Sequence, residues 1–187
     1  MSALSAVEIR PARPDDVAAL AALARVTFYE AYDALAQPSD LDAYTTEHYS
    51  LTQLEKELVD PLITIWLGLH GAEAVGFLQL AAVAAPPEVK GRKPLKLDRL
   101  YLRKSAWGLG LGRRFMELML RTATERGHDS VWLSVWEKNP RALRFYQNWG
   151  FIDIGWEIFM TGEDRSIDRL MELSLAATPP EASAPVG

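Results

Sequence analysis

Three glycines within five positions, Gly108, Gly110 and Gly112, separate a short apolar segment from a helical pattern. The segment before them, Leu97 to Leu102, is rich in β-favouring residues, and apolar side chains recur at helical spacing after Arg113. Because glycine has no side chain, the backbone can turn sharply there and a ligand can touch peptide N–H groups directly. A helix start also carries unpaired N–H donors and the positive end of the helix dipole. The sequence therefore predicts a strand, a turn and a helix whose first amides bind an anion, most naturally a phosphate.

The spacing of these glycines excludes two common nucleotide motifs. A dinucleotide fingerprint needs G-x-G-x-x-G, but Arg113 stands three residues after Gly110. A P-loop needs Gly-Lys-Ser/Thr after four spacer residues, and the sequence has no such triplet. The phosphate ligand is therefore of another kind, and we expect Arg113 and Arg114 to add positive charge beside it.

Composition narrows the class of protein. A chain of 187 residues with 49% hydrophobic and 24% charged residues fits one globular domain with a sizeable core. The formal net charge of -5 disfavours nucleic acid or an anionic membrane as the main partner and suits a neutral or cationic small molecule. The first residues lack the apolar core of a signal peptide, and no apolar run approaches the length of a membrane span. We expect a cytoplasmic protein, monomeric or homodimeric.

The sequence lacks the residues that several common kinds of site require. The chain has no cysteine, so it has no disulfide framework and no cysteine acyl-enzyme route. The three histidines, His48, His70 and His128, show no ligand spacing, so we expect no metal site. A Gly-x-Ser-x-Gly elbow is also absent, which removes the commonest hydrolase interpretation.

Local patterns predict the elements on both sides of the glycines. The first half reads as a strand over Val7–Arg10, a helix from Asp15 to before Pro38, a helix over Ser39–Tyr49, a helix from the Ser50 cap to Asp60, a hairpin of strands over Ile63–Leu69 and Ala74–Val83, and an exposed loop over Ala84–Pro94. The second half reads as a helix over Leu111–Glu125 ended by Gly127, a central strand over Val131–Trp136, a helix from the Asn139 cap to Gly150, and strands over Phe151–Ile154, Trp156–Met160 and Ile167–Leu175 around a turn at Gly162–Asp164.

These elements predict one α/β domain over residues 7–175, with a mixed, twisted sheet and helices on both faces. The strand before the glycines, the helix after them and the strand over Val131–Trp136 form a βαβ unit with two parallel strands. The tail over residues 176–187 is made of small residues and prolines, so we expect it to be disordered.

Two segments resemble the signatures of the GNAT superfamily of N-acetyltransferases. The G-L-G-L-G run resembles its pyrophosphate loop, Gln/Arg-x-x-Gly-x-Gly/Ala, with Gly110 and Gly112 at the glycine positions and Trp107 where Gln or Arg is usual. The second segment, NPRALRFYQNWGF, resembles N-x-x-A-x-x-F-Y-x-x-x-G-F, and its anchors match in register at Asn139, Ala142, Phe145, Tyr146, Gly150 and Phe151. Two motifs in this order imply an acetyl-CoA dependent N-acetyltransferase that uses no metal.

The resemblance also implies where acetyl-CoA binds. The pantetheine arm would bond to the backbone of Leu100, Tyr101 and Leu102, and the pyrophosphate would rest on amides from Gly108 to Arg113. The full set of implied cofactor-binding residues is Leu100, Tyr101, Leu102, Trp107, Gly108, Leu109, Gly110, Leu111, Gly112, Arg113, Asn139, Ala142 and Tyr146. Tyr146 is the implied catalytic residue, a general acid that protonates the leaving thiolate.

The acceptor is a primary amine whose identity the residues leave open. An attacking amine must lose a proton, and Asp98 and Glu30 are candidate bases. The segments TFYEAY, ELVDP, LDRLYL, SVWEKN and IDRLMEL resemble the PaiA-like bacterial polyamine acetyltransferases, although Lys104 stands where that branch commonly has proline. The alternatives are acetylation of protein N-termini or amine antibiotics, and a CoA-binding sensor without turnover. We expect the first helices and Ala84–Pro94 to form the acceptor pocket.

Overall fold

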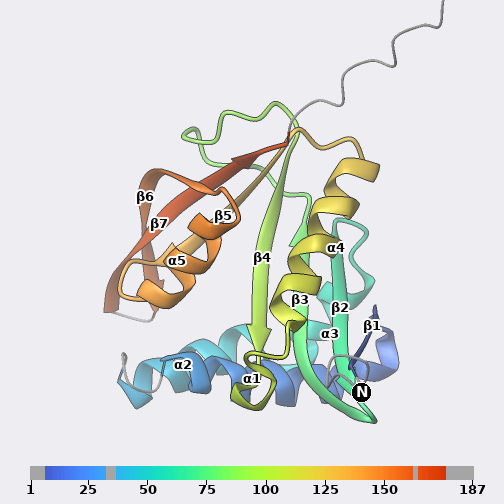
Figure 1. Ribbon diagram of the computed structural model, residues 1–187. Coiled ribbons are helices and arrows are strands. Elements are labelled where there is room, and N and C mark those ends of the chain that lie inside the picture. The colour runs from blue at the N-terminus through green and yellow to red at the C-terminus, as the bar shows by residue number, and fades with distance from the viewer. Residues whose placement is uncertain (1–6, 33–36, 162–163, 176–187) are drawn as a thin grey trace, which may run out of the picture.

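Seven strands form one mixed sheet in the computed structural model, which describes residues 7–32, 37–161 and 164–175 (Figure 1). The strand order is β1-β2-β3-β4-β5-β7-β6. Its strands are β1 (Val7–Pro11), β2 (Ile63–His70), β3 (Glu73–Ala81), β4 (Pro94–Leu102), β5 (Ser130–Trp136), β6 (Ile152–Thr161) and β7 (Asp164–Ser174). β4 and β5 are parallel, and every other neighbouring pair is antiparallel. The prediction of a mixed sheet with a central strand at Val131–Trp136 is confirmed.

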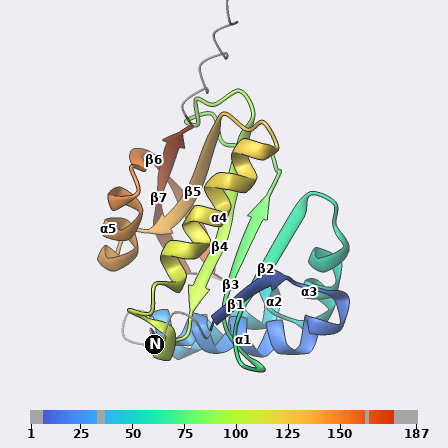
Figure 2. The same ribbon diagram turned by 45° about the vertical axis from the view of Figure 1, so that its right-hand side comes forward.

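Helices cover both faces of this sheet, as predicted (Figures 1 and 2). They are α1 (Val17–Tyr32), α2 (Pro38–His48), α3 (Leu51–Val59), α4 (Leu111–Glu125) and α5 (Pro140–Asn148), with short 3-10 turns at Pro14–Asp16 and Lys104–Ala106. On one face, α4 and α5 bury Phe115, Met119 and Tyr146 against the central strands. On the other face, Leu20 and Leu54 pack with strand residues such as Phe77 in a second core.

Capping residues set the starts of two helices where the sequence predicted them. The Ser50 hydroxyl accepts a hydrogen bond from the Gln53 amide at the start of α3. At the start of α5, the Asn139 side chain accepts from the Ala142 amide at 3.1 Å, and Pro140 occupies the first helical turn, where its missing N–H costs nothing. The register of α5, and with it the position of Tyr146, therefore follows from local sequence.

The parallel strands β4 and β5 separate soon after they begin. Their pairing runs only from Pro94–Ser130 to Lys96–Trp132, and Figure 1 shows them diverging beyond that point. The register of β3 against β4 also shifts so that Asp98 is an extra residue, a β-bulge that changes the direction of the strand. Both features open the sheet beside Leu100–Leu102, where one edge of β4 has no neighbouring strand.

Three predicted boundaries were wrong for identifiable reasons. The segments Phe151–Ile154 and Trp156–Met160 form one strand, β6, because the irregularity near Gly155 is a bulge within the strand and not a break. β4 begins at Pro94, since its first residues pair with β5. The first helix starts at Val17, after the 3-10 turn at Pro14–Asp16. The predicted turn at Gly162–Asp164 and the tail over residues 176–187 lie outside the described residues, wholly or in part.

Candidate active site

Two cavities meet where β4 and β5 separate. The first, which we call the glycine-loop cavity, has a volume of about 750 Å³ and lies between the end of β4, the turn before α4 and the start of α5. The second, the tyrosine cavity, has a volume of about 330 Å³ and is lined by α1, α2, α5 and strands β4 to β7. Both cavities are lined by Leu100, Tyr101, Asn139, Ala142 and Tyr146. Two separate ligands can therefore reach each other at this junction.

The turn before α4 presents bare backbone to the glycine-loop cavity. Gly108 and Gly110 have positive φ angles of 76° and 77°, which residues with side chains rarely adopt. Gly110 is the N-cap of α4 and supplies no capping side chain, and the Arg114 amide donates to the Gly110 carbonyl at 3.1 Å. The amides of the first turn are thus left to the cavity, where they favour an anion.

The predicted cofactor-binding residues come together around this cavity. All of them except Leu109 line it, from Leu100 on β4 to Tyr146 on α5. Arg113 lines it as well, although its side chain pairs with Glu117 one helical turn later. Arg114 does not, contrary to expectation, because its guanidinium donates to the Val7 carbonyl at 2.6 Å.

The Trp107 side chain makes two contacts that the sequence motif did not predict. Its indole N–H donates to the Leu102 carbonyl at 3.1 Å, which ties the turn to the end of β4. The Arg141 guanidinium lies 3.2 Å from the centre of the Trp107 ring, so a cation from α5 stacks on the glycine turn. Partial burial lowers the pKa of Arg141, and no described carboxylate forms an ion pair with it. A positive charge thus stands beside the position where Gln or Arg is usual.

Tyr146 lies at the junction and is buried. Phe145 and Phe151 contact its ring edge-to-face, which fixes the ring orientation. Burial raises the pKa of Tyr146, and the nearby Tyr32 acts in the same direction, so the hydroxyl stays protonated at neutral pH. In this state it can donate a proton or a hydrogen bond.

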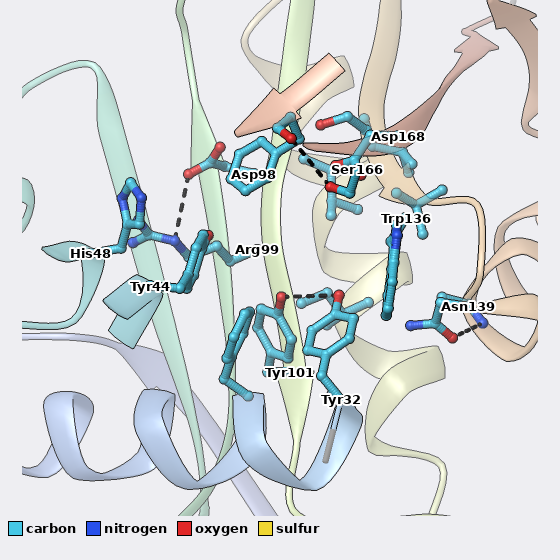
Figure 3. A pocket seen from close by; sticks show the side chains of 18 of the residues that line it. Tyr32, Tyr44, His48, Asp98, Arg99, Tyr101, Trp136, Asn139, Ser166 and Asp168 are labelled. Atoms are coloured by element: carbon cyan, nitrogen blue, oxygen red, sulfur yellow. Dashed lines mark hydrogen bonds and ion pairs between the residues drawn. The ribbon is translucent and has the colours of Figure 1, made fainter. Parts of the chain in front are cut away.

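Several aromatic side chains line the tyrosine cavity (Figure 3). The Tyr32 hydroxyl lies 3.5 Å from that of Tyr101, and the Tyr32 ring packs 5.8 Å from Trp136. Burial raises the pKa of both tyrosines, so they remain neutral. Tyr44 stacks on Phe28 toward the other end. The cavity therefore offers flat, electron-rich faces to a ligand, which suit a cation or an alkyl chain.

A buried ion pair forms part of the cavity lining. The Arg99 guanidinium binds the Glu57 carboxylate through two nitrogens, at 2.5 and 3.2 Å, and the Gln79 side chain bridges to both partners. The side chains of Arg99 and Glu57 are only 9% and 7% exposed. Since Glu57 neutralises it, Arg99 does not give the cavity a free positive charge.

The carboxylates proposed as bases from sequence are held by other groups. Glu30 accepts from the Arg103 side chain and from the Lys104 amide, and it lines the glycine-loop cavity, not the tyrosine cavity. Asp98 does line the tyrosine cavity, but it pairs with Lys96 at 2.7 Å and accepts from Gln79. The loop over Ala84–Pro94 lines neither cavity, contrary to expectation.

Asp168 on β7 was not singled out from the sequence. It is half-buried and lines the tyrosine cavity, and its carboxylate has no hydrogen bond or ion pair with any described residue. Burial raises its pKa to about 6, assisted by the charge of Glu157 and opposed by that of Lys96. The only signal in the sequence was its place in the IDRLMEL segment, because a strand of alternating residues does not reveal which face meets a cavity.

Comparison with known proteins identifies the family. The model of the acetyltransferase (GNAT) family matches residues 26–151. An uncharacterized N-acetyltransferase of Lactobacillus delbrueckii subsp. lactis is 27% identical over 172 residues, covering 92% of this chain and 99% of that protein. A probable spermine N(1)-acetyltransferase of Bacillus subtilis subsp. natto is 28% identical over 102 residues, covering 54% of this chain and 66% of that protein.

A solved structure supports the same fold. The PaiA N-acetyltransferase of Thermoplasma acidophilum, in complex with coenzyme A, has a TM-score of 0.73 at 21% identity and covers 90% of this chain and 99% of its own. Within the described residues, no helix combines the length and apolar composition that crossing a membrane requires. The same residues contain no group of three or more His, Asp and Glu side chains placed to hold a metal ion.

Proposed function

The chain belongs to the acetyltransferase (GNAT) family, and on this basis we propose that it transfers an acetyl group from acetyl-CoA directly to a primary amine of a small polycation such as a polyamine. The observation that carries the proposal is the junction of the two cavities at Leu100, Tyr101, Asn139, Ala142 and Tyr146. Because the cavities meet, an acetyl thioester from one side and an amine from the other can react without a covalent enzyme intermediate.

Acetyl-CoA fits the glycine-loop cavity in three respects. The open amides after Gly110 suit the pyrophosphate. Arg113 and the Arg141 guanidinium stacked on Trp107 add charge for the phosphates, and Arg141 thereby supplies a cation where the family motif has Gln or Arg. The edge of β4 at Leu100–Leu102 has no neighbouring strand, although the Leu102 carbonyl accepts from Trp107, and it suits the amides of the pantetheine arm, which can pair with it as an added strand does.

Tyr146 acts as the general acid in this proposal. Bond formation between the amine nitrogen and the acetyl carbon breaks the carbon–sulfur bond, and the leaving thiolate needs a proton. Tyr146 lines both cavities, and burial keeps its hydroxyl protonated.

A cationic acceptor is favoured by the charges of the tyrosine cavity. Asp40, Asp98 and Asp168 line it, and both of its described lysine and arginine side chains are paired, Arg99 with Glu57 and Lys96 with Asp98. Aromatic walls stabilise ammonium groups and accommodate the alkyl chains between them. The similarity to a probable spermine N(1)-acetyltransferase points to the same class of acceptor.

The test measures CoA release with polyamines, peptides and aminoglycosides as acceptors. We expect polyamines to give the highest kcat/KM. With the preferred amine, Tyr146→Phe should lower kcat about 100- to 10,000-fold, while the acetyl-CoA dissociation constant stays within a few-fold, because only the hydroxyl is removed. A wild-type protein that binds acetyl-CoA but releases no CoA with any amine would be a sensor. A Tyr146→Phe variant that keeps full kcat would show that Tyr146 is not the general acid.

A further inference from the structure

The strand register places two carboxylates directly opposite each other beside the tyrosine cavity. Asp168 on β7 pairs with Glu157 on β6 and, on its other side, with Trp136 on β5. Like charges directly opposite in a sheet destabilise it, and neither carboxylate has an ion pair with a described residue within 4 Å. This arrangement lowers stability, so a role in function is a better explanation for it than a role in folding.

The Asp168 carboxylate is accessible from the cavity where the acceptor amine would lie. It lines the tyrosine cavity together with Trp136 and with Tyr101 and Tyr146, the last two of which also line the glycine-loop cavity. Figure 3 shows Asp168 and Ser166 above Trp136, on the side opposite Tyr101 and Tyr32. Asp98, the other carboxylate of this cavity on the sheet, is held by Lys96. Of the two described sheet carboxylates that line this cavity, Asp98 and Asp168, it is therefore Asp168 that can accept a proton without first breaking an ion pair.

We propose that Asp168 binds the acceptor ammonium and is the general base that removes its proton before it attacks acetyl-CoA. This inference rests on the proposed function. The amine enters as a primary ammonium, and the Asp168 carboxylate takes one proton to give the neutral amine. The nitrogen lone pair then forms the carbon–nitrogen bond as the carbon–sulfur bond breaks.

The protons of this step balance. Tyr146 gives its proton to the thiolate, and the second nitrogen proton restores the Tyr146 hydroxyl through water. Asp168 releases its proton to solvent. The products are the N-acetylated amine, CoA with a free thiol, and one proton.

The charged groups around Asp168 make the idea testable by pH. Glu157 faces it from β6, Lys96 from β4 and the neutral Tyr32 from α1, while the facing residue on β5 is Trp136. Burial and Glu157 together raise the pKa of Asp168 to about 6, so the carboxylate is the main form at neutral pH and is lost as the pH falls through that value. We therefore expect kcat/KM to fall as the pH drops below about 6, and we call this fall the acidic limb of the pH profile.

The experiment compares Asp168→Asn with Glu157→Gln, using a polyamine acceptor. Asp168→Asn should lower kcat/KM about 100- to 10,000-fold at pH 7.5 and remove the acidic limb, with unchanged acetyl-CoA affinity by calorimetry. Its melting temperature should equal or exceed that of the wild type, because the repulsion from Glu157 is gone. Glu157→Gln should keep the wild-type kcat/KM at pH 8 and move the acidic limb to lower pH, since it removes a charge that raises the pKa of Asp168.

Each outcome separates this inference from the proposed function. A wild type without amine-dependent CoA release defeats the proposed function itself. An active wild type whose Asp168→Asn variant keeps full kcat/KM, or whose acidic limb does not move in Glu157→Gln, overturns the role of Asp168 alone. If Asp168→Asn fails to fold, the shift of the limb in Glu157→Gln still decides the question.

Discussion

Removal of Glu57 should destabilise the protein strongly, because the buried Arg99 guanidinium would lose the carboxylate that it hydrogen-bonds. Its other ion pair, to Asp98, is long at 3.9 Å, and Asp98 is already paired with Lys96. The carboxylate of Glu57 accepts from two nitrogens of Arg99, from Gln53 and from Gln79, and the ion pair is almost fully shielded from water. Breaking a buried pair by removing one partner costs about 3–5 kcal/mol. For a chain of this size, that loss corresponds to a fall in melting temperature of about 6 to 20 °C.

The assay is urea unfolding of Glu57→Ala followed by circular dichroism, with a matched control at an exposed pair. Arg113 and Glu117 pair at 2.8 Å with side chains that are 77% and 49% exposed. Glu117→Ala should therefore cost about 0.5 kcal/mol or less. If Glu57→Ala loses less than about 1 kcal/mol, the guanidinium must find water or another partner, and the reasoning about its burial is refuted.

Two further predictions concern the binding of acetyl-CoA, both measured by calorimetry. Gly110→Val should abolish binding while circular dichroism stays native, because a β-branched side chain strains a φ of 77° and covers the amides; unchanged affinity in a folded variant would contradict the position proposed for the pyrophosphate. Arg141→Ala should weaken acetyl-CoA binding about tenfold or more but leave turnover of S-acetyl-pantetheine, which has no phosphates, unchanged. Equal losses with both donors would show that Arg141 acts on the structure and not on phosphate.

Local signals in the sequence were sufficient for most of the fold. Ser50 and Asn139 cap the helices that they were expected to cap, since a capping bond reaches only three residues along the chain. The extension of β4 back to Pro94 was missed, because it depends on pairing with β5 more than 30 residues later. The bulge in β6 was read as a break for a similar reason, as only the partner strand shows that pairing continues past Gly155.

The two cavities of the candidate site also differ in how far local sequence could predict them. The glycine-loop cavity is built largely from two continuous segments, so a motif in each was enough to find more than half of the residues that line it. The tyrosine cavity draws on seven separate elements, and its members on the sheet become neighbours only through the strand order β4-β5-β7-β6. Asp168 could not be recognised until the register placed it opposite Trp136 and Glu157.

Charge is distributed unevenly between the cavities, which explains why the net charge of -5 was a weak guide to the ligands. The glycine-loop cavity is lined by Lys104, Arg113 and Arg141, whereas Glu30, the one carboxylate among its described lining residues, is held by Arg103. The tyrosine cavity has the opposite character, with Asp168 open to it and its buried Arg99 neutralised. An anionic donor and a cationic acceptor are thus attracted to different entrances, and their reacting ends meet at Tyr146. Higher salt should therefore weaken the binding of both substrates, because each is attracted by charge of the opposite sign.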